Sequence, residues 1–209
     1  ILDRGEATLD VALAAGEAIS DLLIEMNEKA LAASDASLDT ASLSALNEDF
    51  KALRDQISTI VSNAEFNGVN LIDGSTSSFV ALANQDGSNT ITVSSEDMSL
   101  SGSIVSLAVT ASFATGTQAS NIASQIGTSL DAVNSALARL GTKSKALEIH
   151  SSFVTKLSDA LEVGIGNLVD ADLAKESASL QALQVKQQLG TQALSIANQQ
   201  PQSILSYFG

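Results

Sequence analysis

The sequence predicts a mainly α protein, an elongated rod of long antiparallel coiled-coil-like helices with a small β-rich insertion. The first observation is that apolar residues recur at helical spacing from about Thr117 to Phe208. The second is that the only proline, Pro201, stands close to the C-terminus, so nothing earlier removes a backbone donor. The third is a pair of shorter helical patterns before residue 64. The apolar stripe of the long segment consists of Ile126, Leu130, Val133, Leu137, Leu140, Leu147, Val154 and Leu161.

The first 63 residues predict a helical hairpin. Residues 1–33 place most of their large apolar side chains on one broad face, and the polar break at 34–40 offers N-cap residues for a second helix that ends near Asn63. Because the break is short, we expect the two helices to be antiparallel. The inward positions are Leu2, Leu9, Leu13, Ile19, Leu23, Met26 and Leu31 in the first helix, and Leu43, Leu46, Phe50, Leu53, Ile57, Ile60 and Val61 in the second.

The segment 74–116 changes period from helix to strand. Asn67-Gly68 just before it predicts a type I′ turn, which needs positive φ at both positions. Short β-branched runs at 79–83, 90–93 and 104–109 are separated by turn residues at 86–89 and 101–102. We therefore expect a small antiparallel β unit that leans on the helices.

The long helix is predicted to begin near Thr117, with Thr117 as its cap, and to bend or break at Gly164-Ile165-Gly166. Up to about residue 172 it has one apolar stripe, as expected for packing within its own chain. From Ser177 onward the only charged side chain is Lys186, and apolar residues lie on several sides. The chain thus divides into 1–73 and 117–172, which form the rod, the insertion 74–116, and a terminal helix 173–209 suited to burial among other chains.

Composition excludes several classes of function. The net charge of −14 argues against nucleic acid binding, because phosphates need clustered Lys and Arg. Only 3% of the residues are aromatic, which leaves little for a ligand pocket, and the absence of Cys excludes disulfides and thiolate chemistry. The sequence contains no run of eighteen apolar residues, so it predicts no membrane-spanning helix. The start at Ile1, without Met and inside a helical pattern, predicts a fragment that lacks its natural N-terminus.

The chemically interesting side chains favour structural roles. Asp172 and Glu176 share a helix face at i,i+4, but Asp170 points elsewhere and Lys175 stands between them, so pairing with neighbouring chains or capping of a local break is preferred to a metal site. His150 has no evident nucleophile or acid partner and is expected to be a surface or packed histidine. The patterns G-x-S-x-G and G-x-x-x-x-G-K-[ST] are absent. We predict no enzyme activity, no cofactor and no metal.

Three motifs resemble bacterial flagellin, and a fourth resembles its alphaproteobacterial branch. They are Asn63-Ala-Glu-Phe-Asn-Gly-Val-Asn-Leu-Ile-Asp-Gly74, which includes Asn67 and Gly68; Asp170-Ala-Asp-Leu-Ala-Lys-Glu176, an acidic D-x-D-x-A-x-E signature; Gln192-Ala-Leu-Ser-Ile-Ala-Asn-Gln-Gln-Pro-Gln-Ser-Ile-Leu-Ser-Tyr-Phe208; and, for the branch, Gly16-Glu-Ala-Ile-Ser-Asp-Leu-Leu-Ile-Glu-Met-Asn-Glu-Lys-Ala-Leu-Ala-Ala-Ser-Asp35. Together they cover nearly the whole chain outside 75–116.

The resemblance implies a secreted filament subunit of the bacterial flagellum that self-assembles for motility. The helical rod would line an outer tube, the terminal helices an inner tube, and the insertion would face outward; the N-terminal inner-tube helix is absent here. Implied partners are other copies, an export chaperone, the type III export apparatus, and hook-associated and cap proteins. The expected assembly residues are Leu180, Leu183, Leu189, Leu194, Ile196, Ile204 and Leu205.

The resemblance also bears on host recognition. Flagellins detected by the vertebrate innate receptor carry a basic residue in a pattern resembling R-V-R-E-L-A, and here Glu25, Met26 and Glu28 occupy that region. Glu25 stands where the important arginine would be. Because a reversed charge weakens an electrostatic contact, we expect this chain to evade the receptor.

Other interpretations are a hook–filament junction protein, which shares the terminal helices, and a secreted adhesin or glycan-binding module that uses 74–116. The Ser- and Thr-rich insertion is ordinary loop composition or an O-glycosylated outer face.

Overall fold

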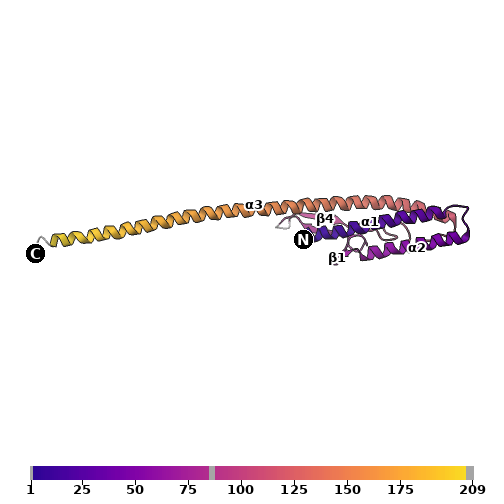
Figure 1. The fold of residues 1–209 in the computed structure, drawn as a ribbon, viewed down its shortest axis with the longest axis horizontal. Helices are drawn as coiled ribbons and strands as arrows, with labels where there is room; N and C mark the ends of the chain where they lie inside the picture. Colours follow the sequence, from indigo (N-terminus) through magenta and orange to yellow (C-terminus); the bar gives the residue numbers. More distant parts are fainter. Residues whose placement is uncertain (1, 85–87, 206–209) are drawn as a thin grey trace. The chain divides into compact units, whose positions relative to one another are not determined.

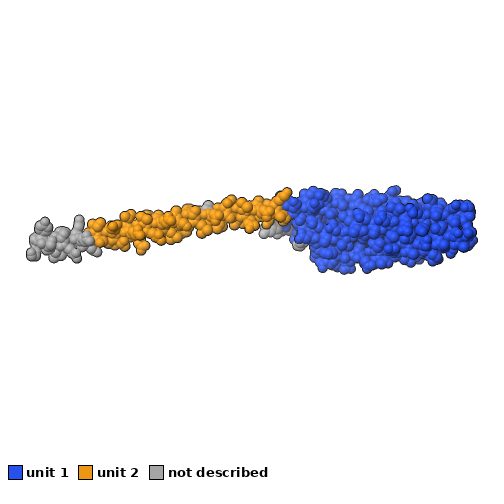
Figure 2. Space-filling model, viewed as in Figure 1, with its two compact units in different colours: residues 1–153 blue, residues 154–209 orange. Residues whose placement is uncertain are grey.

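The computed structural model describes residues 2–84 and 88–205, without the side chains of residue 171 and residues 198–205. It contains two compact units, residues 1–153 and 154–209, which Figure 2 shows in different colours. The elements are α1 (Leu2–Ala33), α2 (Thr40–Asn63), β1 (Glu65–Phe66), β2 (Val69–Asn70), β3 (Ser78–Leu82), β4 (Thr90–Ser94) and α3 (Gly116–Leu205) (Figure 1). The mainly α fold class with a small β-rich insertion is confirmed.

The helices α1 and α2 form the predicted hairpin, and in Figure 1 they lie alongside the first part of α3. The turn between them ends where the Asp39 carboxylate accepts a hydrogen bond from the Ser42 N–H at 2.7 Å, which satisfies one free donor of the first turn of α2. This bond lowers the pKa of Asp39. The prediction that Leu31 of α1 faces inward is wrong, because its side chain is 65% exposed.

The core of the first unit lies between α1, α2, the insertion and the first part of α3. Glycines let α1 come close to its neighbours: a Cβ at Gly16 would lie 2.6 Å from Leu137 Cδ2, and one at Gly5 would lie 2.7 Å from Phe79 Cε1. The largest fully buried side chains are Phe50, Leu9, Ile19, Leu23, Met26, Ile57, Leu71, Ile72, Met98, Leu107, Ile126 and Leu140.

The turn predicted at Asn67-Gly68 is confirmed. Strands β1 and β2 pair antiparallel around it, and φ is 51° at Asn67 and 80° at Gly68, as a type I′ turn requires. The next residues cap α2: the buried Asn70 amide donates to the Val61 carbonyl at 2.7 Å and its oxygen accepts from the Ile72 N–H at 2.9 Å. The hairpin thereby ends the helix and starts the insertion.

Two of the three predicted strands are present. Strands β3 and β4 pair antiparallel, from Ser78 opposite Ser94 to Leu82 opposite Thr90. Of the predicted turn at 86–89 between them, residues 86 and 87 lie outside the described residues.

The third predicted strand, 104–109, is wrong. This run contains only an isolated bridge between Val105 and Leu100. Its main chain is satisfied elsewhere: the Ile104 N–H donates to the Asp97 carbonyl at 3.2 Å, and the Leu107 carbonyl accepts from the Ser101 N–H at 2.8 Å. Ile104, Val105 and Leu107 of the run are buried and supply core contacts without a strand ladder, whereas Val109 is 54% exposed.

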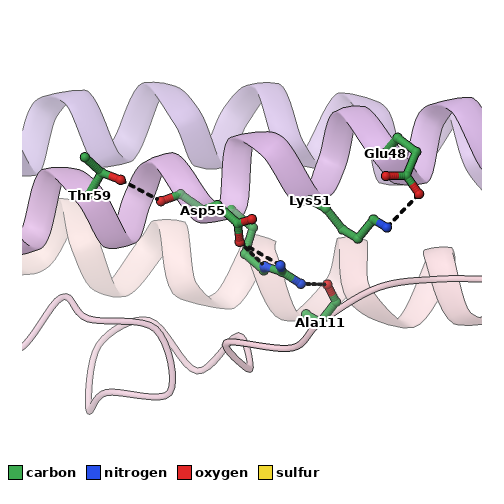
Figure 3. A network of polar contacts seen from close by, with 6 residues as sticks. Glu48, Lys51, Asp55, Thr59 and Ala111 are labelled. Carbon is green, nitrogen blue, oxygen red and sulfur yellow. Dashed lines mark hydrogen bonds and ion pairs between the residues drawn. The ribbon is translucent and has the colours of Figure 1, made fainter.

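Side chains of α2 hold the end of the insertion by its main chain. Arg54 donates from Nη1 to the Ala111 carbonyl at 2.7 Å and is fixed by an ion pair with Asp55 at 2.6 Å, as Figure 3 shows. About two helical turns before Arg54, the Asn47 Oδ1 accepts a hydrogen bond from the Phe113 N–H at 2.8 Å.

Side chains of α3 hold the insertion in the same way. The Ser129 Oγ accepts from the Ser106 N–H at 3.2 Å, and the His150 Nε2 lies 2.7 Å from the Ala83 carbonyl oxygen. The histidine is therefore a packed structural residue, as the sequence indicated, and its partner is a main-chain carbonyl.

The start of α3 differs slightly from the prediction. The helix begins at Gly116, and its cap is Thr115 rather than Thr117: the Thr115 Oγ1 accepts from the Gln118 N–H at 3.3 Å. The Gln118 side chain in turn accepts from the Ala114 N–H at 2.8 Å. These bonds satisfy donors at the helix start, which leaves Thr117 inside the first turn.

The helix break predicted at Gly164-Ile165-Gly166 is absent, and a bend there stays a prediction. Helix α3 continues through it without interruption. A glycine costs about 1 kcal/mol relative to Ala in a helix but keeps its backbone N–H, so two glycines weaken the ladder without breaking it.

Candidate assembly surface

The candidate surface is the part of α3 that follows Phe153. Every described side chain from Val154 to Ala197 is exposed. Among these residues fourteen are large and apolar: Val154, Leu157, Leu161, Val163, Ile165, Leu168, Val169, Leu173, Leu180, Leu183, Val185, Leu189, Leu194 and Ile196. Burying one such side chain contributes about 1.5–3 kcal/mol. A large exposed apolar surface of this kind is typical of a site of interaction with another protein.

The predicted packing of α3 within its own chain extends too far. The stripe is buried or half-buried as far as Leu147, but Val154 and Leu161 are exposed. The reason is length. Helix α1 has 32 residues, and the first 32 residues of α3 are 116–147, so two antiparallel helices of equal rise cover each other only to that point. Counting helix lengths in the sequence would have found this boundary.

The expected assembly residues lie on this surface. Leu180, Leu183, Leu189, Leu194 and Ile196 are between 54% and 65% exposed. At 100° per residue, the first, second and fourth of these fall on one side of the helix and the other two on another. Ile204 and Leu205 belong to α3, but their side chains lie outside the described residues.

The acidic motif sits on the same uninterrupted stretch of helix. Asp170, Asp172 and Glu176 are exposed, and because α3 does not break nearby, they cap no local helix end. In the part of the chain that the structure describes, no three His, Cys, Asp or Glu side chains are grouped as metal ligands. Pairing of these acids with neighbouring chains stays a prediction.

The residues of the suspected receptor region separate into two kinds. Glu25 and Glu28 are exposed on α1, whereas Met26 is fully buried in the core. Met26 is thus part of the packed stripe and is not available to a receptor.

No helix in the described residues has a stretch long and apolar enough to cross a bilayer.

Comparisons with known proteins agree with this arrangement. Residues 3–77 match the family described as Bacterial flagellin N-terminal helical region, and residues 123–208 match Bacterial flagellin C-terminal helical region. Flagellin FljK of Caulobacter vibrioides is 56% identical over 207 residues, which are 99% of this chain and 75% of the relative. A flagellin of Brucella melitensis is 38% identical over 220 residues, covering 99% of this chain and 76% of the relative.

The fold is shared with a solved structure as well. The crystal structure of Bacillus cereus flagellin superposes with a TM-score of 0.64 at 20% identity, covering 76% of this chain and 93% of that chain.

Long helices with a large exposed apolar surface define a structural protein that assembles with other copies. The chain belongs to the bacterial flagellin family. It is a structural subunit of the flagellar filament, the extracellular helical array into which flagellins assemble. Membership in this family implies a structural rather than a catalytic role.

Proposed function

We propose that the exposed surface of α3 beyond Phe153 is buried between neighbouring copies in the filament. The observation that carries this proposal is the fourteen exposed large apolar side chains on several sides of the helix, with Lys186 as the only charge after Ser177. Repeated contacts between unlike surfaces of identical subunits generate an open helical tube. Burial of these side chains supplies the driving force for adding each subunit.

The four segments take different places in this tube. Residues 1–73 and 117–172 form the outer tube, 74–116 faces outward, and 173–209 forms the inner tube. Burial supports the packing of 1–73, 74–116 and the first part of α3 on one another, and Leu147 is the last described residue of α3 that is buried. Because residues 148–172 are half-buried or exposed, apart from the undescribed side chain of residue 171, their partners in the outer tube are other helices than those of the first unit.

Before assembly the same surface needs protection. A contiguous apolar surface on a free subunit favours aggregation, which supports binding by an export chaperone. We therefore propose delivery through the type III export apparatus and assembly beneath cap proteins onto hook-associated proteins, outside the cell.

Single cysteines test the proposed burial, because the chain has none of its own. Val185 and Val80 are matched, with 54% and 49% exposure. Val185→Cys in the full-length protein should react with a thiol reagent in the monomer and be protected at least about tenfold in filaments, because water is excluded there. Val80→Cys should react in both states, because the insertion faces outward. Equal labelling of the two filaments would refute the proposal.

We also propose that the chain escapes the vertebrate innate receptor. The exposed Glu25 on α1 supports this, because its charge is opposite to that of the residue in detected flagellins. Glu25→Arg should raise activation of reporter cells several-fold relative to the native full-length protein. Full activation by the native protein would contradict the proposal.

A further inference from the structure

The turn between β1 and β2 contains the only Asn-Gly pair of the chain, Asn67-Gly68. Both residues are exposed, and no hydrogen bond joins the Asn67 side-chain amide to another described residue. A Cβ built at Gly68 would meet nothing within 4 Å, so no neighbour crowds this side of the turn. The amide is therefore accessible to water and to the main-chain nitrogen that follows it.

An asparagine that precedes a glycine can lose its side-chain nitrogen without an enzyme. The main-chain nitrogen of Gly68 attacks Cγ of Asn67 and the new C–N bond closes a succinimide ring, while the side-chain nitrogen leaves as ammonia with the proton of the attacking amide. Water then opens the ring. Opening at the original main-chain carbonyl gives isoaspartate, in which the main chain runs through the former side chain. Glycine favours the reaction because it has no Cβ to obstruct the attack.

The folded turn holds the two reacting groups apart. Asn67 and Gly68 have the positive φ values of a type I′ turn, and the turn closes the antiparallel pair of Phe66 with Val69. Because this turn is the mirror image of type I, ψ at its first central residue is about +30°. At that angle the Gly68 nitrogen and the Asn67 side chain lie on nearly opposite sides of the Cα–C bond. Ring closure needs them on the same side, so the turn has to open first.

The residues after this turn join the end of α2 to the insertion (Figure 1). The buried Asn70 amide donates to the Val61 carbonyl and so caps α2. The Ile72 carbonyl, which follows, accepts a hydrogen bond from the Met98 N–H at 2.9 Å and pairs this segment with the insertion. An isoaspartate at position 67 would add a main-chain carbon to a turn built for two residues, and the register that places Asn70 would then be lost.

We propose that Asn67 is a deamidation site that is closed by the β1–β2 hairpin in the folded subunit and open in the unfolded chain. When folding comes first, the amide is protected, because ψ of Asn67 is held away from the angle of attack and the reaction waits for local opening. When deamidation comes first, the longer main chain prevents the hairpin from capping α2. Chains that stay unfolded for long are therefore the ones that lose the amide and fold with less stability. The site involves no contact with another copy and does not depend on the surface beyond Phe153.

Peptide mapping by mass spectrometry tests the site in the full-length subunit, incubated at mildly alkaline pH as the folded monomer and in urea. The deamidation rate at Asn67 should be at least about tenfold higher in urea, because the folded subunit reacts only during local opening of the hairpin. Asn134, which precedes a serine, is the internal control in the same digest. In urea it should deamidate at least about tenfold more slowly than Asn67, because it lacks the following glycine. Equal rates at Asn67 in the two states, or at Asn67 and Asn134 in urea, would overturn the proposal.

Thermal unfolding after removal of urea measures the consequence for the fold. Asn67→Gly is the matched control, because Gly-Gly also forms type I′ turns but has no amide to lose, and its midpoint should not change on incubation. The isoaspartate-containing fraction of the native sequence should fail to refold or should melt at least about 4 °C lower than the unincubated chain, since the cap of α2 is lost. Asn67→Asp adds the charge without lengthening the main chain and should melt within about 2 °C of the native sequence. An unchanged midpoint for the isoaspartate fraction, or an equally low one for Asn67→Asp, would overturn the role of the lengthened turn.

Discussion

Replacing Leu189 by Asp in the full-length protein should abolish filaments. Leu189 is 60% exposed in the free subunit and lies on the part of α3 that we propose to be buried between copies. A carboxylate placed there would lose its hydration without gaining a partner, which costs several kcal/mol at every subunit addition. Electron microscopy of cell surfaces and of exported protein should show subunits in the medium and no filaments.

The adjacent Gln188→Asp variant is the matched control. It introduces the same charge one residue earlier, on a side of the helix between the two groups of apolar side chains. We expect it to form filaments, with the amount of exported protein equal for both variants. Normal filaments from Leu189→Asp would refute the placement of this residue in the assembly surface.

Phe50→Ala should have the largest effect on the stability of the free subunit. Phe50 is fully buried on α2, and its ring lies 5.2 Å from that of Phe113, at 57° between the ring planes. The substitution removes this aromatic contact and leaves a cavity where α2 meets the residues that lead into α3. Deleting a buried Phe side chain typically costs about 3–5 kcal/mol. Urea unfolding followed by circular dichroism measures the loss.

Phe153→Ala is the control for this prediction, because it makes the same chemical change at an exposed site. Phe153 is 55% exposed, near the point where the packed part of α3 ends. We expect its free energy of unfolding to change by less than about 0.5–1 kcal/mol. Equal losses for the two variants would show that the Phe50 site is not the packed junction described above.

Local signals account for the parts of the fold that were predicted correctly. Helix α2 begins after a polar residue that caps it and ends before the Asn67-Gly68 turn, and both features act over three or four residues. Strand β4 is rich in β-branched residues, β3 contains Phe79 and Val80, and turn residues separate the two, so short-range preferences suffice for them as well.

The errors come from interactions between distant residues. The run 104–109 has the composition of a strand, but its hydrogen bonds go to Asp97, Ser101 and the side chain of Ser129, which no local pattern reveals. Likewise, periodicity cannot tell whether an apolar stripe is covered by the same chain or by another. The periodicity therefore assigns Val154 and Leu161 to the stripe packed within the chain. In the structure both are exposed, because α1 is too short to cover them.

The sequence predicts that the end of α3 is a surface for other chains, but it does not predict how far towards the N-terminus of α3 this surface extends. The loss of charge after Ser177 identified the terminal part of α3 as a surface for other chains. The same signal is absent between residues 154 and 176, where charged and apolar residues alternate, so this region was assigned to internal packing. Met26 was named both for the packed stripe and for a receptor region, and only its burial decides between the two.

The way in which the helices hold the insertion has a consequence for evolution. Asn47, Arg54, Ser129 and His150 all bind main-chain atoms of the segment 83–113. A main-chain amide or carbonyl is the same whatever side chain stands at that position. Exposed residues of the insertion are thus free to change without loss of these anchoring contacts. Four helical side chains therefore hold the insertion in place, whatever side chains its exposed positions carry.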